Sequence, residues 1–202
     1  MAIRKDVTVI LDAGHGASTK GKRSPILEDG RQLFEWKFTR ELSNKLEIML
    51  ENNGIKCIQA NKDDSDPGLT QRANNINNIY NQEKKNGRTA IMISLHGNAA
   101  GSGEWMNARG WEVWTTEGIT RSDELAQCFV HAFHDVMPDM KLRGHKEKNF
   151  TLLYKTNCPC VLTENFFYDN KEDCKFMLSE NGINKIVELH VKAIINYLNK
   201  TK

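Results

Sequence analysis

Residues 7–16 read VTVILDAGHG, and this stretch decides the fold. The run 7–11 is continuously apolar and rich in β-branched side chains, which is typical of a strand buried on both faces. A polar segment with Asp12 and His15 follows at once, and glycines flank the histidine. We therefore predict a buried strand that delivers His15 just beyond its carboxyl end.

Outward from this strand, segments of strand and helix character alternate along the chain. Short apolar runs predict further strands at 55–59, 89–95, 110–115, 150–154 and 160–163. Apolar residues at helical spacing predict helices at 33–53, 66–84, 122–136, 171–179 and 183–199, the second capped by Asp66 with Pro67 at its first position. This order favours one α/β domain over residues 1–202, with a core at about 7–198. We expect a mostly parallel, twisted sheet of about six strands with helices on both faces.

The composition limits the class of protein. Apolar residues make up 39% and charged residues 27% of the 202, which is typical of a globular domain rather than a disordered chain. The net charge of +2 gives no sign of a dedicated nucleic-acid binder, and we interpret the basic cluster at 141–148 as a solvated loop. No apolar run is long enough for a transmembrane helix or a signal peptide, so we expect synthesis in the cytoplasm. The five cysteines include no C-x-x-C pair and are expected to be reduced.

Chemically competent side chains follow three of the predicted strands. His15 follows the first strand, His96 follows the strand 89–95, and Glu164 follows the strand 160–163. Because ligands of open α/β sheets bind beyond the carboxyl ends of the strands, these side chains are expected at one edge. Glu35 begins the first long helix, whose amino-terminal end lies at the same edge.

Two imidazoles and one carboxylate are a ligand set that catalytic zinc uses, with a further position left for water. A lone histidine is more often structural, but His15 and His96 each follow an apolar run and precede a glycine. We therefore predict that His15, Glu35 and His96 bind one zinc ion. Zinc lowers the pKa of a bound water to about 7, and a free carboxylate must then move its proton. We expect Glu164 to have that role.

At these residues the sequence resembles the zinc-dependent N-acetylmuramoyl-L-alanine amidases of the amidase-3 type. The family's D-A-G-H-G motif is matched by residues 12–16, and its S-x-H-x-N motif by Ser94, His96 and Asn98. The glutamate that heads its first helix is matched by Glu35, and the catalytic glutamate of a late strand by Glu164. Its L-x-x-R pattern is matched by Leu69 and Arg72. The resemblance covers residues 7–198.

The resemblance implies a peptidoglycan hydrolase with one zinc ion per chain. It would cleave the amide between N-acetylmuramic acid and L-alanine of the stem peptide, by a zinc-activated water with Glu164 as general base and acid. Asn98 could stabilise the oxyanion, and Arg72 could contact substrate or support the site. One departure concerns the turn after the glutamate, where the family has glycine and this chain has Phe166.

Two other functions fit the same residues. A zinc peptidase that cuts other peptide bonds would need the same metal set, and a non-enzymatic wall-binding protein could use the same fold. We expect a monomer that binds peptidoglycan, has no separate wall-binding domain and no nucleic-acid partner, and acts on the wall after release or export. The lack of a recognisable signal peptide favours lysis by a phage-type endolysin over a cellular autolysin, and the sequence leaves both open.

Overall fold

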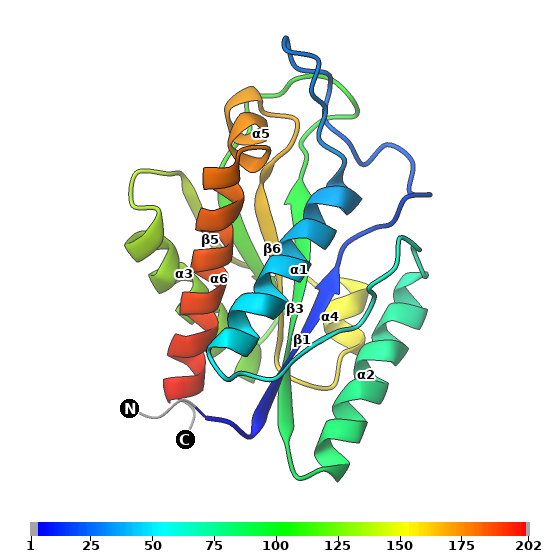
Figure 1. Ribbon diagram of the computed structural model, residues 1–202, viewed down its shortest axis with the longest axis vertical. Coiled ribbons are helices and arrows are strands. Elements are labelled where there is room, and N and C mark those ends of the chain that lie inside the picture. The colour runs from blue at the N-terminus through cyan, green and yellow to red at the C-terminus, as the bar shows by residue number, and fades with distance from the viewer. Residues whose placement is uncertain (1–3, 201–202) are drawn as a thin grey trace.

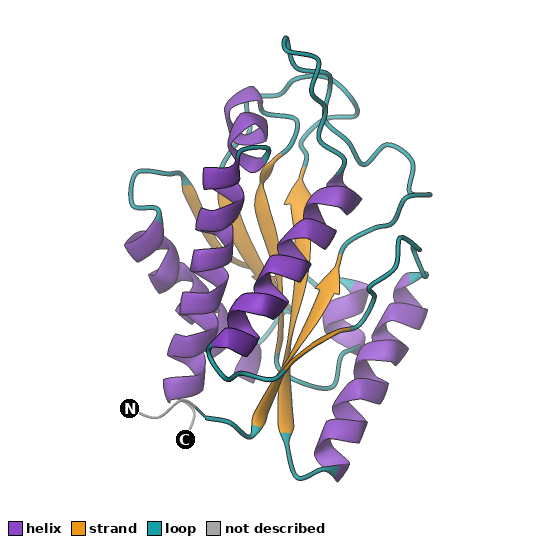
Figure 2. Ribbon diagram, in the orientation of Figure 1, coloured by secondary structure: helices purple, strands orange, loops and turns teal. Residues whose placement is uncertain are grey.

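The computed structural model describes residues 4–200 and has a six-stranded sheet between two layers of helices (Figure 1, Figure 2). The strand order is β2-β1-β3-β6-β4-β5. The strands are β1 (Val7–Ala13), β2 (Cys57–Gln59), β3 (Thr89–Asn98), β4 (Trp111–Thr115), β5 (Leu142–Glu147) and β6 (Cys160–Phe167). The helices are α1 (Glu35–Asn52), α2 (Leu69–Lys85), α3 (Arg121–Val136), α4 (Thr151–Lys155), α5 (Lys171–Met177) and α6 (Glu180–Lys200).

The sheet is mostly parallel, as predicted. β2, β1, β3 and β6 run parallel to one another, whereas β4 pairs with β6 in the antiparallel direction and with β5 in the parallel direction. Figure 2 shows long loops gathered at the end toward which the arrowheads of β1 and β3 point. This end is where a ligand of an open α/β sheet binds.

The two faces of the sheet carry separate apolar cores. Side chains that alternate along a strand point to opposite faces, so Val9 and Leu11 pack with α1, α3 and α6, whereas Ile10 packs with α2 and α4. Figure 1 shows α1 and α6 in front of the sheet and α4 behind it. The candidate site lies at the carboxyl ends of the central strands, where His15 follows β1 and where β3 carries His96.

Three predicted elements differ from the structure. The run 150–154 forms helix α4 rather than a strand, because a short apolar run has no period that distinguishes the two. The basic segment at 141–148, predicted as a loop, contains the edge strand β5. Its many charged residues lack the apolar pattern by which a strand is predicted, and charges are common on edge strands. Helix α2 begins at Leu69, with Gly68 as its N-cap and no side-chain cap. Asp66, which was predicted to cap it, accepts a hydrogen bond from Thr19.

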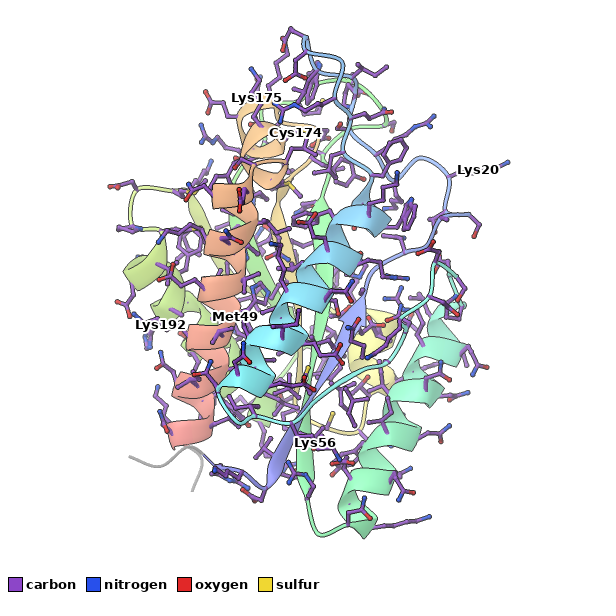
Figure 3. All side chains as sticks on the ribbon, viewed as in Figure 1. Lys20, Met49, Lys56, Cys174, Lys175 and Lys192 are labelled. Atoms are coloured by element: carbon purple, nitrogen blue, oxygen red, sulfur yellow. The ribbon has the colours of Figure 1, made fainter. Side chains whose placement is uncertain are left out.

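The interior between the sheet and the helices is filled with side chains, among them the cysteines (Figure 3). The five cysteines are buried and free, as expected for reduced thiols. Figure 3 shows how side chains fill the space between the sheet and the helices, while Lys20 extends away from the body on the loop between β1 and α1. Across residues 4–200, no helix combines the length and the apolar character needed to span a bilayer.

His190 of α6 lies in the core, and its titration predicts an acid-sensitive stability. Its Nδ1 lies 2.8 Å from the Ile186 carbonyl and its Nε2 lies 3.1 Å from the Thr163 hydroxyl. Burial lowers the pKa of His190 to about 4, against a slight opposing effect of the Ile186 carbonyl. Between about pH 6.5 and about pH 4 the unfolded chain binds a proton here that the folded chain does not, so stability falls as the pH falls.

We expect the free energy of unfolding to drop by up to about 3 kcal/mol across this window because of His190 alone. The variant His190→Gln, which cannot titrate, should lose that part of the pH dependence. Urea unfolding of both proteins at about pH 7 and about pH 4.5 measures the difference. Equal pH dependence in the two proteins would mean that His190 takes up its proton in the folded state as readily as in the unfolded one.

Candidate metal centre and active site

The structure brings His15, Glu35 and His96 together at the carboxyl edge of the sheet. One possible ligand atom from each lies within 4.8 Å of the others. Glu35 Oε1 is 3.1 Å from His96 Nδ1, and Glu35 Oε2 is 3.3 Å from His15 Nε2, although the second contact lacks the alignment of a hydrogen bond. Glu35 is almost fully buried, whereas the two imidazoles keep 17% and 14% of their side-chain surface exposed.

This cluster fits a divalent cation. Oε2 of Glu35 is buried without a hydrogen-bond partner among residues 4–200, which is costly unless a positive charge lies beside it. Burial alone would raise the pKa of Glu35, but the neighbouring imidazoles of His15 and His96 outweigh it and lower the pKa to about 2. Burial lowers the pKa of His96, despite the opposing effect of Glu35. An ionised carboxylate and a neutral imidazole are the forms that bind a metal.

The backbone that presents His15 is strained and closely packed. His15 has φ = 60°, which is uncommon for a residue other than glycine and occurs where surrounding contacts hold it. Its neighbour Gly14 leaves no room for a side chain: a Cβ there would lie 2.5 Å from His96 Cε1 and 2.8 Å from the Leu95 carbonyl oxygen. The glycine thus lets the two histidine-bearing segments approach each other.

Arg40 of α1 holds this turn in place. Its guanidinium donates hydrogen bonds to the carbonyl oxygens of Ala13 at 2.9 Å and His15 at 2.7 Å. The Thr39 hydroxyl donates to the Gly14 carbonyl at 2.8 Å. Arg40 was not predicted to be part of the site, and its one signal in the sequence is a cation on the apolar side of an amphipathic helix.

Arg72 lies beneath the site and is buried. Its Nε and Nη2 donate to the two oxygens of Asp12 at 3.0 and 2.6 Å, and the Ser94 hydroxyl donates to Asp12 at 2.7 Å. Arg72 therefore fixes the end of β1 against β3. Of the two roles considered for it, contact with substrate or support of the site, this position fits support.

Glu164 lies beside the cluster on β6. It is the in-register partner of His96 on β3, so the two side chains point to the same face. It is partly exposed, but its Oε2 is buried and has no hydrogen-bond partner among the described residues. Burial, followed by the charges of Glu35 and Glu112, raises the pKa of Glu164 well above its usual value. A cation bound by the neighbouring ligands would offset that effect.

Glu112 of β4 lies beside Glu164 on the neighbouring strand, and it was not predicted to be a site residue. It is the antiparallel partner of Glu164 and is 2% exposed. The Asn98 Nδ2 donates to its Oε1 at 2.8 Å, while Arg143 and Lys146 of β5 each donate to its Oε2 at 2.6 Å. Asn98 is thus partly committed to Glu112. The signal available was a carboxylate inside the alternating strand WEVW.

The segment after Glu164 continues strand β6 rather than turning, and its pairing with β3 shifts register at Phe166. Phe166 stands where the resembling family has glycine, and it has φ = 71°. Its ring is fully buried, with the ring centroids of Phe176 and Phe133 at 5.1 and 6.5 Å. This aromatic packing stabilises a backbone conformation that phenylalanine rarely adopts.

Comparison with known proteins gives consistent results. The model of the N-acetylmuramoyl-L-alanine amidase family matches residues 9–196. The chain is 26% identical over 196 residues to N-acetylmuramoyl-L-alanine amidase CwlM of Bacillus licheniformis, covering 97% of this chain and 70% of that protein. It is 27% identical over 201 residues to the endolysin of Bacillus phage SPP1, covering 96% and 67%. The crystal structure of an N-acetylmuramoyl-L-alanine amidase from Clostridium difficile 630 superposes with a TM-score of 0.83 at 26% identity, covering 98% of this chain and 100% of that chain.

Proposed function

The chain belongs to the N-acetylmuramoyl-L-alanine amidase family, and we propose that it hydrolyses the lactyl–L-alanine amide of peptidoglycan with one zinc ion bound by His15, Glu35 and His96. The observation that carries the metal assignment is the cluster of these three side chains around a buried, unpartnered carboxylate oxygen. Two histidines and a carboxylate are a ligand set of catalytic zinc sites in hydrolases. When bound, zinc would polarise the substrate carbonyl and lower the pKa of a water, so that the water becomes a nucleophile near neutral pH.

The protein's own groups have separate tasks in this proposal. Glu35 is oriented before any ligand arrives, because its Oε1 accepts a hydrogen bond from the Gly97 backbone at 3.1 Å. Arg40 and Thr39 keep the carbonyls of the 13–15 turn in place and so fix the direction of His15. Asn98, whose amide donates to Glu112, supports the row of acids beside the site.

Glu164 moves the proton. Its Oε2 is buried without a hydrogen-bond partner among the described residues, and Glu164 pairs in register with His96, so it can accept a proton from the attacking water. The same oxygen then returns the proton to the nitrogen of L-alanine, which leaves as an amine. Once it has taken the proton from the water, the Glu164 carboxyl is the general acid that this second step needs.

Digestion of purified peptidoglycan with and without a chelator tests the proposal. We expect intact stem peptides with a free L-alanine amino group, and no new reducing ends from the glycan. Removing zinc should lower the rate at least about 100-fold, and added zinc should restore it. Metal analysis of the purified protein should give one zinc per chain. Products cut within the stem peptide would identify a zinc peptidase instead, and full activity without metal would refute the metal assignment.

The biological setting follows as part of the same proposal. The protein acts on the cell wall as a monomer after release or export from the cytoplasm, and lysis is the role we favour. Amidases and a phage endolysin both occur among its relatives. Purified protein added to isolated walls should lower their turbidity, and light scattering should give the mass of a single chain. A stable dimer in solution would correct the oligomeric state without affecting the chemistry.

A further inference from the structure

A β-bulge on the edge strand β5 places two cations, Arg143 and Lys146, beside Glu112, which is the cross-strand partner of Glu164. Trp111 of β4 pairs with Leu142, but the next residue, Glu112, pairs with Gly144, so Arg143 has no partner on β4. Gly144 has φ = 87°, a conformation that glycine adopts without strain. Bulges of this kind redirect a side chain and are frequent beside active sites. Here the extra residue lets both Arg143 and Lys146 reach Glu112.

Both cations are held in fixed positions on Glu112. Each donates to Glu112 Oε2 at 2.6 Å. The Arg143 guanidinium also lies 5.0 Å from the centre of the Phe167 ring, and the Lys146 ammonium lies 5.2 Å from that of Trp114. Contact with an aromatic face and a buried carboxylate restricts side chains that are otherwise among the most mobile.

The group carries more positive charge than Glu112 needs. One carboxylate faces two cations and also accepts hydrogen bonds from Asn98 and from the Trp114 indole. Neither cation has another hydrogen-bonded carboxylate among the described residues, and Arg143 and Lys146 keep 28% and 30% of their side chains exposed. A fixed, partly exposed pair of cations with donors to spare suits a carboxylate ligand.

This pair lies close to where the bond is cut. Glu112 and Glu164 are partners on adjacent antiparallel strands, and the Cβ atoms of such partners lie about 5 Å apart. An extended peptide advances roughly 3.3–3.6 Å per residue, so the next residue or two beyond the leaving nitrogen would reach the two cations. In the substrate, the lactyl carboxyl is consumed in the scissile amide. The nearest free carboxylates therefore belong to the stem peptide.

We propose that Arg143 and Lys146, positioned on Glu112, form a subsite that binds a carboxylate of the stem peptide and so selects substrates by their charge. This inference rests on the proposed amidase function. The carboxylate could be the α-carboxylate of the glutamate that follows L-alanine, which some walls carry as an amide, or the carboxylate at the end of the peptide. Both sources share the same chemistry, and synthetic substrates separate them.

The test uses four N-acetylmuramoyl tripeptides that carry either a carboxylate or a neutral amide at each of these two positions. We expect the zinc-loaded protein to cleave all four and to prefer a free carboxylate at one position about tenfold in kcat/KM, chiefly through KM. Arg143→Gln and Lys146→Gln should each lower the ratio of kcat/KM for carboxylate over amide substrates most of the way to one, and this ratio is the readout whatever the rate on the amidated substrate. Arg143→Lys should recover part of the preference.

Lys148→Gln is the matched control, because Lys148 is an exposed cation just beyond β5 that contacts Phe150 and not Glu112. It should keep the full preference. Zinc content and thermal unfolding of each variant show that the protein is folded and loaded. Equal losses on all four substrates would mean that the cations only support Glu112 and would overturn the subsite, as would a wild-type protein that cleaves all four equally. No cleavage of any substrate by the wild-type protein would instead refute the amidase function.

Discussion

Replacing Glu164 with alanine is expected to lower kcat about 10³-fold or more while leaving one zinc bound per chain. The side chain lies next to the proposed ligands but is not among the clustered ligand atoms, so its loss should not empty the metal site. Its removal takes away the group that accepts the proton from water and returns it to the leaving nitrogen. Zinc content and the rate of stem-peptide release measure the two effects separately.

Glu164→Gln sharpens this experiment, because it keeps the size of the side chain and removes only the ability to carry a proton. We expect it to be as inactive as Glu164→Ala. Glu188→Ala, which removes an exposed glutamate of α6, serves as the control and should retain full activity. Turnover within a few-fold of wild type in either Glu164 variant would assign proton transfer to another group.

Adding a single methyl group at Gly14 is expected to abolish activity by displacing His96. A Cβ at this position would lie 2.5 Å from Cε1 and 2.6 Å from Nδ1 of His96, closer than real Cβ atoms approach other atoms. The third close contact, the Leu95 carbonyl at 2.8 Å, is backbone of β3 and has little freedom to move. The imidazole must therefore rotate away from Glu35, and a zinc affinity at least about tenfold lower should follow.

Gly68→Ala is the matched control, since a Cβ there meets no atom within 4 Å and φ is −57°. Competitive titration with a chelator gives the zinc affinity of both variants, and circular dichroism tests whether they fold. Normal zinc affinity in Gly14→Ala would show that the turn between β1 and His15 adjusts more easily than its hydrogen bonds to Arg40 and Thr39 suggest.

The positions of His15, His96 and Glu164 could be predicted from the sequence, because they depend on local apolar runs and on the parallel order of the strands. His15, His96 and Glu164 each follow an apolar run, and the carboxyl ends of parallel strands must meet at one edge. Their meeting with Glu35 could therefore be expected from the chain alone. Their roles as ligands and as proton carrier stay predictions until the metal and kinetic measurements are made.

Glu112 and Arg40 were not predicted, because their roles depend on contacts with residues that are distant in the sequence. The strand containing Glu112 was predicted, but the burial of its carboxylate is tolerable only because Arg143 and Lys146 arrive from β5. The strand character of β5 was itself masked by its charges. Arg40 likewise is an ordinary helix residue in the sequence, and its function depends on carbonyl groups that only the folded turn presents.

The backbone at Phe166 has a practical consequence for chimeric enzymes. Its left-handed conformation depends on the rings of Phe133 and Phe176, which come from α3 and α5. A segment exchange that moved only the end of β6 into a relative would carry the strained residue without the neighbours that hold it. Recombination of this domain with others should therefore transfer the three aromatic residues as one unit, or place glycine at position 166 of β6 and refill the space that the ring leaves.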